Sequence, residues 1–194
     1  MESRKDSLST HLGIFLVLVL VYALLSRFAV VNSPVSPAQG VSGIYFAAAV
    51  MIAFVLWYGM WGALAAYFGC LLGAASLIDM PFSLSLIWSL ADFWQVLIPL
   101  IAFVSLGADI TLKTRRDLAI FLVFGLFLNN LVGAVWGSSV LVAGGIVPWS
   151  EYRIIFQGWF IGNLVVTIFI TPLLLRFVTP YLRNTRSYVM NYWS

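Results

Sequence analysis

Residues 41–78 read VSGIYFAAAVMIAFVLWYGMWGALAAYFGCLLGAASLI and decide the fold of this chain. They belong to a stretch of 51 residues, 28–78, that contains no charged side chain. A helix needs roughly 20 apolar residues to cross a bilayer, so this stretch predicts two membrane-spanning helices. The segment WYGMWG at 57–62 predicts the turn between them, because aromatic side chains gather at the level of the lipid headgroups.

The rest of the chain has the same character. Of its 194 residues, 62% are hydrophobic and only 9% are charged, whereas a soluble domain has roughly 25% charged residues. This composition excludes a soluble enzyme, a nucleic-acid-binding module and a disordered protein. We predict an all-α membrane protein, a bundle of six transmembrane helices, with a segment 1–11 before this domain, 12–177, and a short basic and aromatic tail, 178–194. The predicted spans are 12–31, which resembles a secretory signal but is expected to be retained, 41–56, 60–78, 84–106, 118–142 and 155–177.

Basic residues predict the orientation. With six spans, both termini and the loop between spans four and five share one side of the membrane. That side collects eight basic residues and the other side only two, Arg27 and Arg153. Lys and Arg concentrate in cytoplasmic loops, so both termini are expected in the cytoplasm of a prokaryotic cell, with the protein in its plasma (inner) membrane. Because the net charge of +3 lies at membrane boundaries, we expect the lipid bilayer and no nucleic acid as a partner.

The chain has very few of the residues that usually support catalysis and metal binding. His11 and Cys70 are the only histidine and the only cysteine. A metal site with several histidines, a disulfide and a Ser–His pair at Gly137-Ser138-Ser139 are therefore excluded. We predict no enzymatic activity, no metal and no cofactor.

Small residues recur at helical spacing in three spans. Such residues let helices approach closely between lipid tails, and we expect them to pack the bundle internally. The positions are Gly62, Ala66, Gly69 and Gly73 in span three, Gly125, Gly133 and Gly137 in span five, and Gly158 and Gly162 in span six.

Span four carries polar side chains on one face. Ser85, Ser89, Asp92 and Gln95 recur at steps of four, three and three. An Asp near the centre of a membrane helix costs roughly 2.5–3.5 kcal/mol, so Asp92 should face the interior and meet hydrogen-bond donors. We interpret these residues as a small-ligand pocket anchored by Asp92; the alternative is a polar network that only fixes helix register. The other predicted members of the pocket, which also supply candidate donors to Asp92, are Asn129, Asn130, Asn163, Trp88, Trp94 and Trp136.

Several short motifs resemble the MASE1 integral membrane sensor domain. They are GAVWG at 133–137, VAGGIVPWS at 142–150, WFIGN at 159–163 and ITPLLL at 170–175. The resemblance covers most of residues 38–177 and implies a six-helix sensor that acts through an output domain. Asn163 stands where the family usually has Asp, and Gln95 where it often has Glu.

The resemblance favours a sensor-like domain that binds a small ligand and signals through a separate partner protein, since only 17 residues follow the last span. One alternative is the substrate-binding subunit of an energy-coupling-factor-type importer, whose partner is a transporter module. In that family span one carries two alanines four apart, whereas Ala23 and Ala29 are six apart. Another alternative is a structural accessory subunit of a membrane complex.

Overall fold

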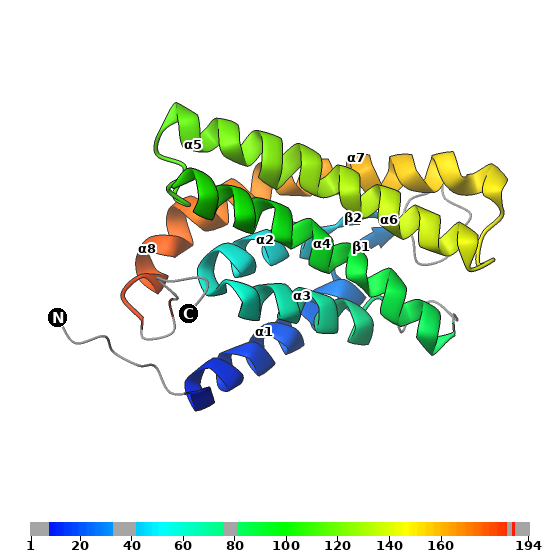
Figure 1. The fold of residues 1–194 in the computed structure, drawn as a ribbon, viewed down its shortest axis with the longest axis horizontal. Helices are drawn as coiled ribbons and strands as arrows, with labels where there is room; N and C mark the ends of the chain where they lie inside the picture. Colours follow the sequence, from blue (N-terminus) through cyan, green and yellow to red (C-terminus); the bar gives the residue numbers. More distant parts are fainter. Residues whose placement is uncertain (1–7, 33–41, 76–80, 186–187, 189–194) are drawn as a thin grey trace.

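The computed structural model is a bundle of long helices with one small antiparallel sheet (Figure 1). It describes residues 8–32, 42–75, 81–185 and 188. Four helical segments are long and apolar enough to cross a membrane: Ser9–Phe28, Phe82–Leu106, Arg115–Ala143 and Trp149–Leu182. Two shorter apolar helices, Phe46–Tyr58 and Met60–Leu72, accompany them. The architecture is consistent with an all-α membrane protein.

The elements follow one another with short connections. In chain order they are α1 (Leu8–Phe28), β1 (Val30–Asn32), β2 (Ser42–Tyr45), α2 (Phe46–Tyr58), α3 (Met60–Leu72), α4 (Phe82–Leu106), α5 (Arg115–Ile120), the π-helix η2 (Phe121–Leu128), α6 (Asn129–Ala143), the 3-10 helix η3 (Trp149–Glu151), α7 (Tyr152–Leu173), the π-helix η4 (Leu174–Val178) and α8 (Thr179–Leu182).

Side-chain contacts bring distant segments together at one end of the bundle. The rings of His11, near the start of α1, and Trp61, at the start of α3, stack with centroids 5.9 Å apart. Trp57 Nε1, at the end of α2, donates a 2.9 Å hydrogen bond to Thr179 Oγ1 at the start of α8. The loop between α4 and α5 lies at this end too (Figure 1). We call it the α5–α8 end.

The helices therefore run up and down between two ends. At the opposite end, a methyl group on Gly144, just after α6, would meet Leu84 at the start of α4. Glycine at position 59 makes the reversal between α2 and α3, with φ of 58°. A side chain rarely adopts this left-handed conformation, so the position favours glycine. The turn falls inside the segment 57–62 in which the sequence predicts it.

Helix α2 is the centre of the bundle. Every residue from Met51 to Tyr58 is buried, as are three alanines at its start. It packs against α1, α3, α4 and α7. A helix that is hydrophobic on all sides is expected in such a position, since it has no polar face to present to solvent.

Three predicted spans differ from the structure. The first, 12–31, extends past the end of helix α1 at Phe28, because residues 30–32 form β1. The prediction of a helix over 41–56 was wrong at its start, because residues 42–45 form β2 and the helix begins at Phe46. Strand β2 pairs antiparallel with β1, with Val30 opposite Tyr45 and Val31 opposite Ile44. Apolar β-branched and aromatic residues suit both a helix in lipid and a strand, so the apolar run alone could not separate them. The third predicted span, 60–78, extends past the end of helix α3 at Leu72; residues 76–78 lie outside the described part.

The glycines of α3 face other helices closely. A Cβ atom added at Gly62 would meet the backbone of Phe54 in α2. At Gly69 it would lie 2.6 Å from Cδ1 of Tyr22 in α1. At Gly73, just after the helix, it would lie 2.8 Å from Cβ of Ser26, also in α1. Only glycine lets α1 and α2 approach α3 to these distances, and Ala66 of the same predicted series is buried.

The predicted small residues of the last two spans differ in how closely other residues pack against them. A methyl group at Gly133 would meet the side chain of Gln95, and one at Gly137 would meet the ring of Trp159. At Gly125 the nearest neighbour is Phe121, which lies four residues earlier in the same helical segment. Gly162 is buried in α7, whereas a methyl group at Gly158 would meet no described atom within 4 Å.

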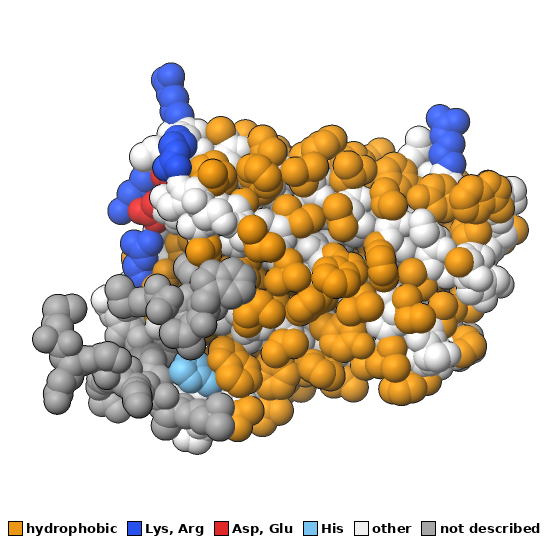
Figure 2. All heavy atoms as spheres, viewed as in Figure 1, with side chains coloured by type: hydrophobic (Ala, Val, Ile, Leu, Met, Phe, Trp, Pro, Cys, Tyr) orange, Lys and Arg blue, Asp and Glu red, His pale blue; other side chains and the backbone are white. Residues whose placement is uncertain are grey.

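The outer surface is largely apolar. Figure 2 shows hydrophobic side chains along the length of one face, with acidic and most basic side chains gathered at the α5–α8 end. Large exposed hydrophobic side chains include Leu16, Leu20, Phe127, Phe169 and Phe177. A soluble monomer rarely exposes contiguous apolar patches of this kind, and lipid is the solvent that suits them.

Candidate functional site

Asp92 is a carboxylate buried between the helices. It lies on α4 with 2% of its surface exposed. Its Oδ2 accepts a 2.7 Å hydrogen bond from the hydroxyl of Tyr22 on α1. Within the described part of the chain, Asp92 forms no salt bridge; the ion pair found there joins Arg183 to Asp109. The carboxylate is thus stabilised by a neutral phenol rather than by a cation.

Two further hydroxyl groups, those of Tyr45 and Ser26, extend this contact. We call Ser26, Tyr45, Tyr22 and Asp92 together the hydroxyl chain. The hydroxyl of Tyr45, on β2, donates to that of Tyr22 over 3.4 Å. Ser26 Oγ lies 2.6 Å from the Tyr45 hydroxyl. Since Tyr45 uses its proton toward Tyr22, Ser26 is the donor in that last contact. All four side chains are buried, so the chain runs through the protein interior from the end of α1 to the middle of α4.

A second buried cluster lies between α4, α6 and α7. Gln95 Nε2 donates to Asn129 Oδ1 over 2.9 Å and to Asn130 Oδ1 over 3.4 Å. Asn130 Nδ2 in turn donates to the backbone carbonyl of Leu126 over 2.7 Å and to Thr167 Oγ1 over 3.4 Å. We call this cluster, together with Asn163, the amide layer.

The amide layer and its surroundings hold buried polar atoms that have no partner among the described residues. An unpaired buried donor or acceptor costs about 1–3 kcal/mol. The unpaired side-chain atoms include Trp88 Nε1, Gln95 Oε1, Asn129 Nδ2, Ser138 Oγ and Asn163 Nδ2.

The predicted site residues therefore divide into three groups. Asp92 belongs to the hydroxyl chain. The predicted amide side chains gather in and around the amide layer, and the ring of Trp88 contacts Trp159 with centroids 5.5 Å apart. Trp94 is 37% exposed and meets the half-buried Trp136 edge to face at 6.0 Å on the outside of the bundle. Trp136 Nε1 donates to the backbone carbonyl of Ile87 over 2.8 Å, which holds α6 against α4.

The predicted partners of Asp92 were wrong. Among the described residues, no hydrogen bond joins Asp92 to Gln95, to the asparagines or to the tryptophan N–H groups, and the donor is Tyr22. Sequence reasoning missed Tyr22, Tyr45 and Ser26. One signal was present, because Tyr22 and Ser26 are four residues apart and so share one face of an otherwise apolar span. Nothing in the sequence pairs that face with Asp92.

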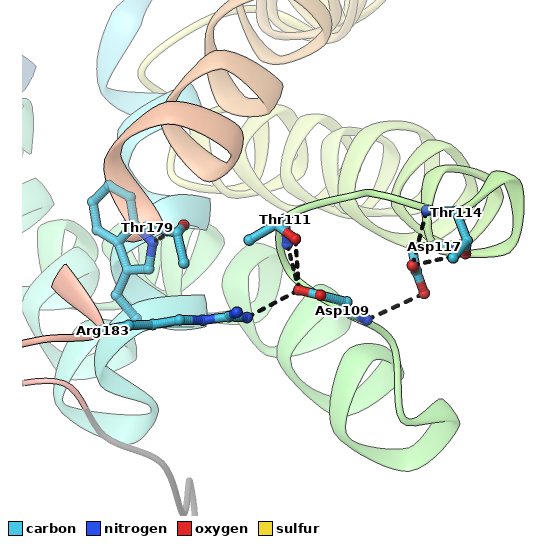
Figure 3. A network of polar contacts seen from close by, with 7 residues as sticks. Asp109, Thr111, Thr114, Asp117, Thr179 and Arg183 are labelled. Atoms are coloured by element: carbon cyan, nitrogen blue, oxygen red, sulfur yellow. Dashed lines mark hydrogen bonds and ion pairs between the residues drawn. The ribbon is translucent and has the colours of Figure 1, made fainter. Parts of the chain in front are cut away.

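A third polar network lies outside the predicted spans, in the loop between α4 and α5 (Figure 3). Asp109 Oδ1 accepts hydrogen bonds from the backbone N–H and the hydroxyl of Thr111 and from Arg183 Nη2, at 2.8–2.9 Å. Burial raises the pKa of Asp109, but these hydrogen bonds outweigh it and hold the pKa below its usual value of 3.8. The network fastens α8 to this loop.

The same loop starts the fifth predicted span. Thr114 and Asp117 form a capping box, in which each side chain accepts a hydrogen bond from the backbone N–H of the other residue. The Thr114 hydroxyl also donates to Asp117 over 2.7 Å. This capping box defines the N-terminus of the 29-residue helical segment Arg115–Ala143.

Neither a metal site nor a relative points to a particular chemistry. In the described ranges, no group of three or more His, Cys, Asp or Glu side chains could hold a metal ion. Comparison with protein-family models, curated proteins and solved structures finds no match to this chain. The resemblance to the MASE1 domain stays a prediction from short motifs, and the site must be interpreted from its own geometry.

Proposed function

We propose that this protein is a six-span membrane protein with both termini in the cytoplasm, which binds a small polar ligand in the amide layer and acts through a separate protein partner. It would reside in a prokaryotic plasma membrane and would bind rather than catalyse.

The arrangement of the helices supports the six-span count. Helix α2 has 13 residues, which is roughly 20 Å at 1.5 Å per residue. The four residues of β2 add roughly 13 Å, and the sum matches the roughly 30 Å of a bilayer's hydrocarbon core. Pairing with β1 satisfies part of the β2 backbone, as a segment at membrane depth requires. Each helix from α1 to α7 then corresponds to one crossing, with α5, η2 and α6 making a single one.

Basic side chains support the orientation. Lys113, Arg115, Arg116 and Arg183 all belong to the α5–α8 end, whereas Arg153 starts α7 at the opposite end. Figure 2 shows this asymmetry on the face in view. The cytoplasmic side of a membrane protein collects such residues, which places the α5–α8 end in the cytoplasm in this proposal.

The unpaired atoms of the amide layer are the observation that carries the ligand proposal. Natural proteins pair most buried polar groups, and an unpaired cluster needs an explanation. The unpaired N–H groups of Trp88, Asn129 and Asn163 offer donors, and Gln95 Oε1 offers an acceptor. A small ligand that carries oxygen acceptors and one or more N–H or O–H donors would satisfy them. Cationic side chains are absent from the described part of this layer, so we favour a neutral or zwitterionic ligand.

Helix α4 could transmit ligand binding to a partner. Gln95 of the amide layer and Asp92 of the hydroxyl chain are three residues apart on α4. A ligand that shifts α4 therefore changes the contact with Tyr22, and so the position of α1. Helix α1 exposes Leu16, Val17, Leu20 and Leu24, and this apolar face is available to a second membrane protein.

Replacing the unpaired amides by leucine tests the ligand proposal. Without a ligand, Asn163→Leu removes an unpaired N–H group and should raise the melting temperature, whereas Asn129→Leu also removes the acceptor of Gln95 Nε2 and should not raise it. We expect that a thermal-shift screen of small polar metabolites finds compounds that stabilise the wild-type protein, and that both variants lose this response. A screen without any stabilising compound, together with an Asn163→Leu variant that is more stable than wild type, would show that the layer is purely structural.

Co-purification from native membranes tests the mode of action. A histidine kinase or a cyclic-dinucleotide enzyme in the complex would support a sensor. An ATPase module would instead identify an importer subunit, and a fixed assembly with other membrane subunits would identify an accessory role.

A further inference from the structure

An apolar groove lies on the outside of the bundle, beside the amide layer. It is a groove of about 470 Å³ between the second half of α4 and the helical segment formed by η2 and α6. Its walls are apolar, with Ile98, Ile101 and Ser105 on α4 facing Phe124, Leu128 and Val132 on the other segment. Figure 1 shows these two segments side by side.

The small side chains of α4 leave the groove open. Ala102 and Ser105 line it where two larger residues would fill it. On the opposite wall, Phe124 and Leu128 belong to the π-helix η2, whose wider turns displace side chains from the regular α-helical pattern. The volume falls within the range of roughly 300–1,000 Å³ that is typical of ligand pockets.

The length of the groove corresponds to one lipid leaflet. It extends along α4 from Ile98 to Leu106, which is roughly 12 Å at 1.5 Å per residue. Half of a bilayer's hydrocarbon core is roughly 15 Å. Since the groove ends where α4 ends, it reaches from the headgroup level of one leaflet toward the midplane.

One basic side chain, Arg116, contacts the end of the groove where α4 ends. Arg116 Nη2 donates a hydrogen bond to the backbone carbonyl of Leu106, which itself lines the groove. Lys113 and Arg115 are exposed in the same loop and the following turn. Within the described ranges, none of these three basic side chains forms an ion pair; the salt bridge found there joins Asp109 to Arg183.

From this juxtaposition we propose that the groove binds an anionic phospholipid, with one acyl chain against the apolar walls and the phosphate headgroup at Arg116. A zwitterionic lipid would fill the groove equally well but would gain less at the basic end. The inference depends on the membrane embedding proposed above and is independent of the ligand proposed for the amide layer.

Native mass spectrometry of the full chain tests this proposal. The protein is released from nanodiscs that contain equal amounts of phosphatidylglycerol and phosphatidylcholine, and the retained lipids are counted. We expect wild type to retain phosphatidylglycerol preferentially. Arg116→Gln should reduce that preference about fivefold, the attraction expected from one basic residue near an anionic surface. Arg153→Gln, at the opposite end of the bundle, is the matched control and should retain the preference.

A second pair of variants tests the acyl-chain contact separately from the headgroup contact. Ser105→Phe places a ring inside the groove and should reduce retention of both lipids, whereas Val135→Phe, on an exposed face outside the groove, should not. The proposal is overturned if wild type retains both lipids equally, if Arg116→Gln keeps the preference, or if Ser105→Phe retains lipid like wild type. Displacement of the lipid by inorganic phosphate would also overturn it, because a headgroup site alone would not need the groove.

Discussion

The hydroxyl of Tyr22 lies 2.7 Å from Oδ2 of Asp92 and donates a hydrogen bond to it across the interface between α1 and α4. The two residues are 70 positions apart in the chain. The same hydroxyl lies 3.2 Å from the sulfur of Met51 on α2, so one phenol connects three helices at the centre of the bundle. This contact gives the buried carboxylate a hydrogen-bond donor from a neighbouring helix.

Removing that phenol hydroxyl should destabilise the protein. Tyr22→Phe keeps the ring in its fully buried position but removes the donor of the 2.7 Å hydrogen bond to Asp92. We expect a loss of about 1–3 kcal/mol in the free energy of unfolding, because a buried polar group loses its partner. Denaturant unfolding in detergent micelles measures the change. Tyr181→Phe, at a residue that is 79% exposed, should be neutral; equal stability of the two variants would contradict the role given to Tyr22.

Removing the charge of Asp92 should separate ligand response from folding. Asp92→Asn nearly preserves the shape of the side chain and can still accept the bond from Tyr22. We expect it to insert and fold like wild type but to lose the ligand-dependent interaction with the partner. Asp92→Leu, which cannot accept that bond, should also lower the melting temperature. A normal response in Asp92→Asn would show that Asp92 serves the scaffold alone.

Leucine at the close-packed glycines should destabilise the bundle, whereas leucine at Gly158 should not. The added side chain collides with Tyr22 at Gly69 and with Gln95 at Gly133. Overpacking of this kind costs roughly 1–3 kcal/mol or more. Gly158→Leu is the matched control, because no described atom lies within 4 Å of the added Cβ. Thermal melting in detergent compares the three variants, and wild-type stability of Gly69→Leu or Gly133→Leu would contradict the packing at that position.

The contact between Asp109 and Arg183 should stabilise the protein only above acidic pH. The pKa of Asp109 is lower in the folded protein than its usual value of 3.8, so its stabilising effect is present above that value and disappears as the pH falls through the folded pKa. Both partners are more than one third exposed, so we expect Asp109→Asn to cost less than about 1 kcal/mol at pH 7. Unfolding measured from pH 7 to pH 3 should show the variant and wild type converging at the acidic end. If the difference in stability between wild type and Asp109→Asn grew as the pH fell, the stabilising role of the Asp109–Arg183 contact would be contradicted.

Reporter fusions test the orientation. Alkaline phosphatase folds only outside the cytoplasm, so its fusion after residue 194 should be inactive. Fusion within the turn between α6 and α7, after residue 146, should be active. The reverse pattern would invert the proposed topology, and activity in both fusions would contradict the even number of crossings.

The polar residues of α4 show how much of the site the sequence predicts. A carboxylate in lipid is costly, so Asp92 had to be interior, and its spacing from Ser89 and Gln95 predicted a common buried face. The amide side chains of the fifth and sixth predicted spans also had to face inward for the same reason. Burial of these residues follows from transfer energies, which depend on residue type and depth.

The partners within that interior required the tertiary structure. Hydrogen bonds depend on which helices are neighbours and on their rotation, and an apolar span has no periodic pattern that fixes either. Thus Tyr22, and not an amide or an indole, donates to Asp92, and residues 42–45 form a strand within an apolar run that the sequence alone assigns to a helix. The chain's composition determined that it forms apolar helices suited to a bilayer, because the cost of exposing charge there is large and local. The contacts at Gly69 and Gly133 decided which helices meet, because close packing depends on complementary shapes brought together from distant parts of the chain.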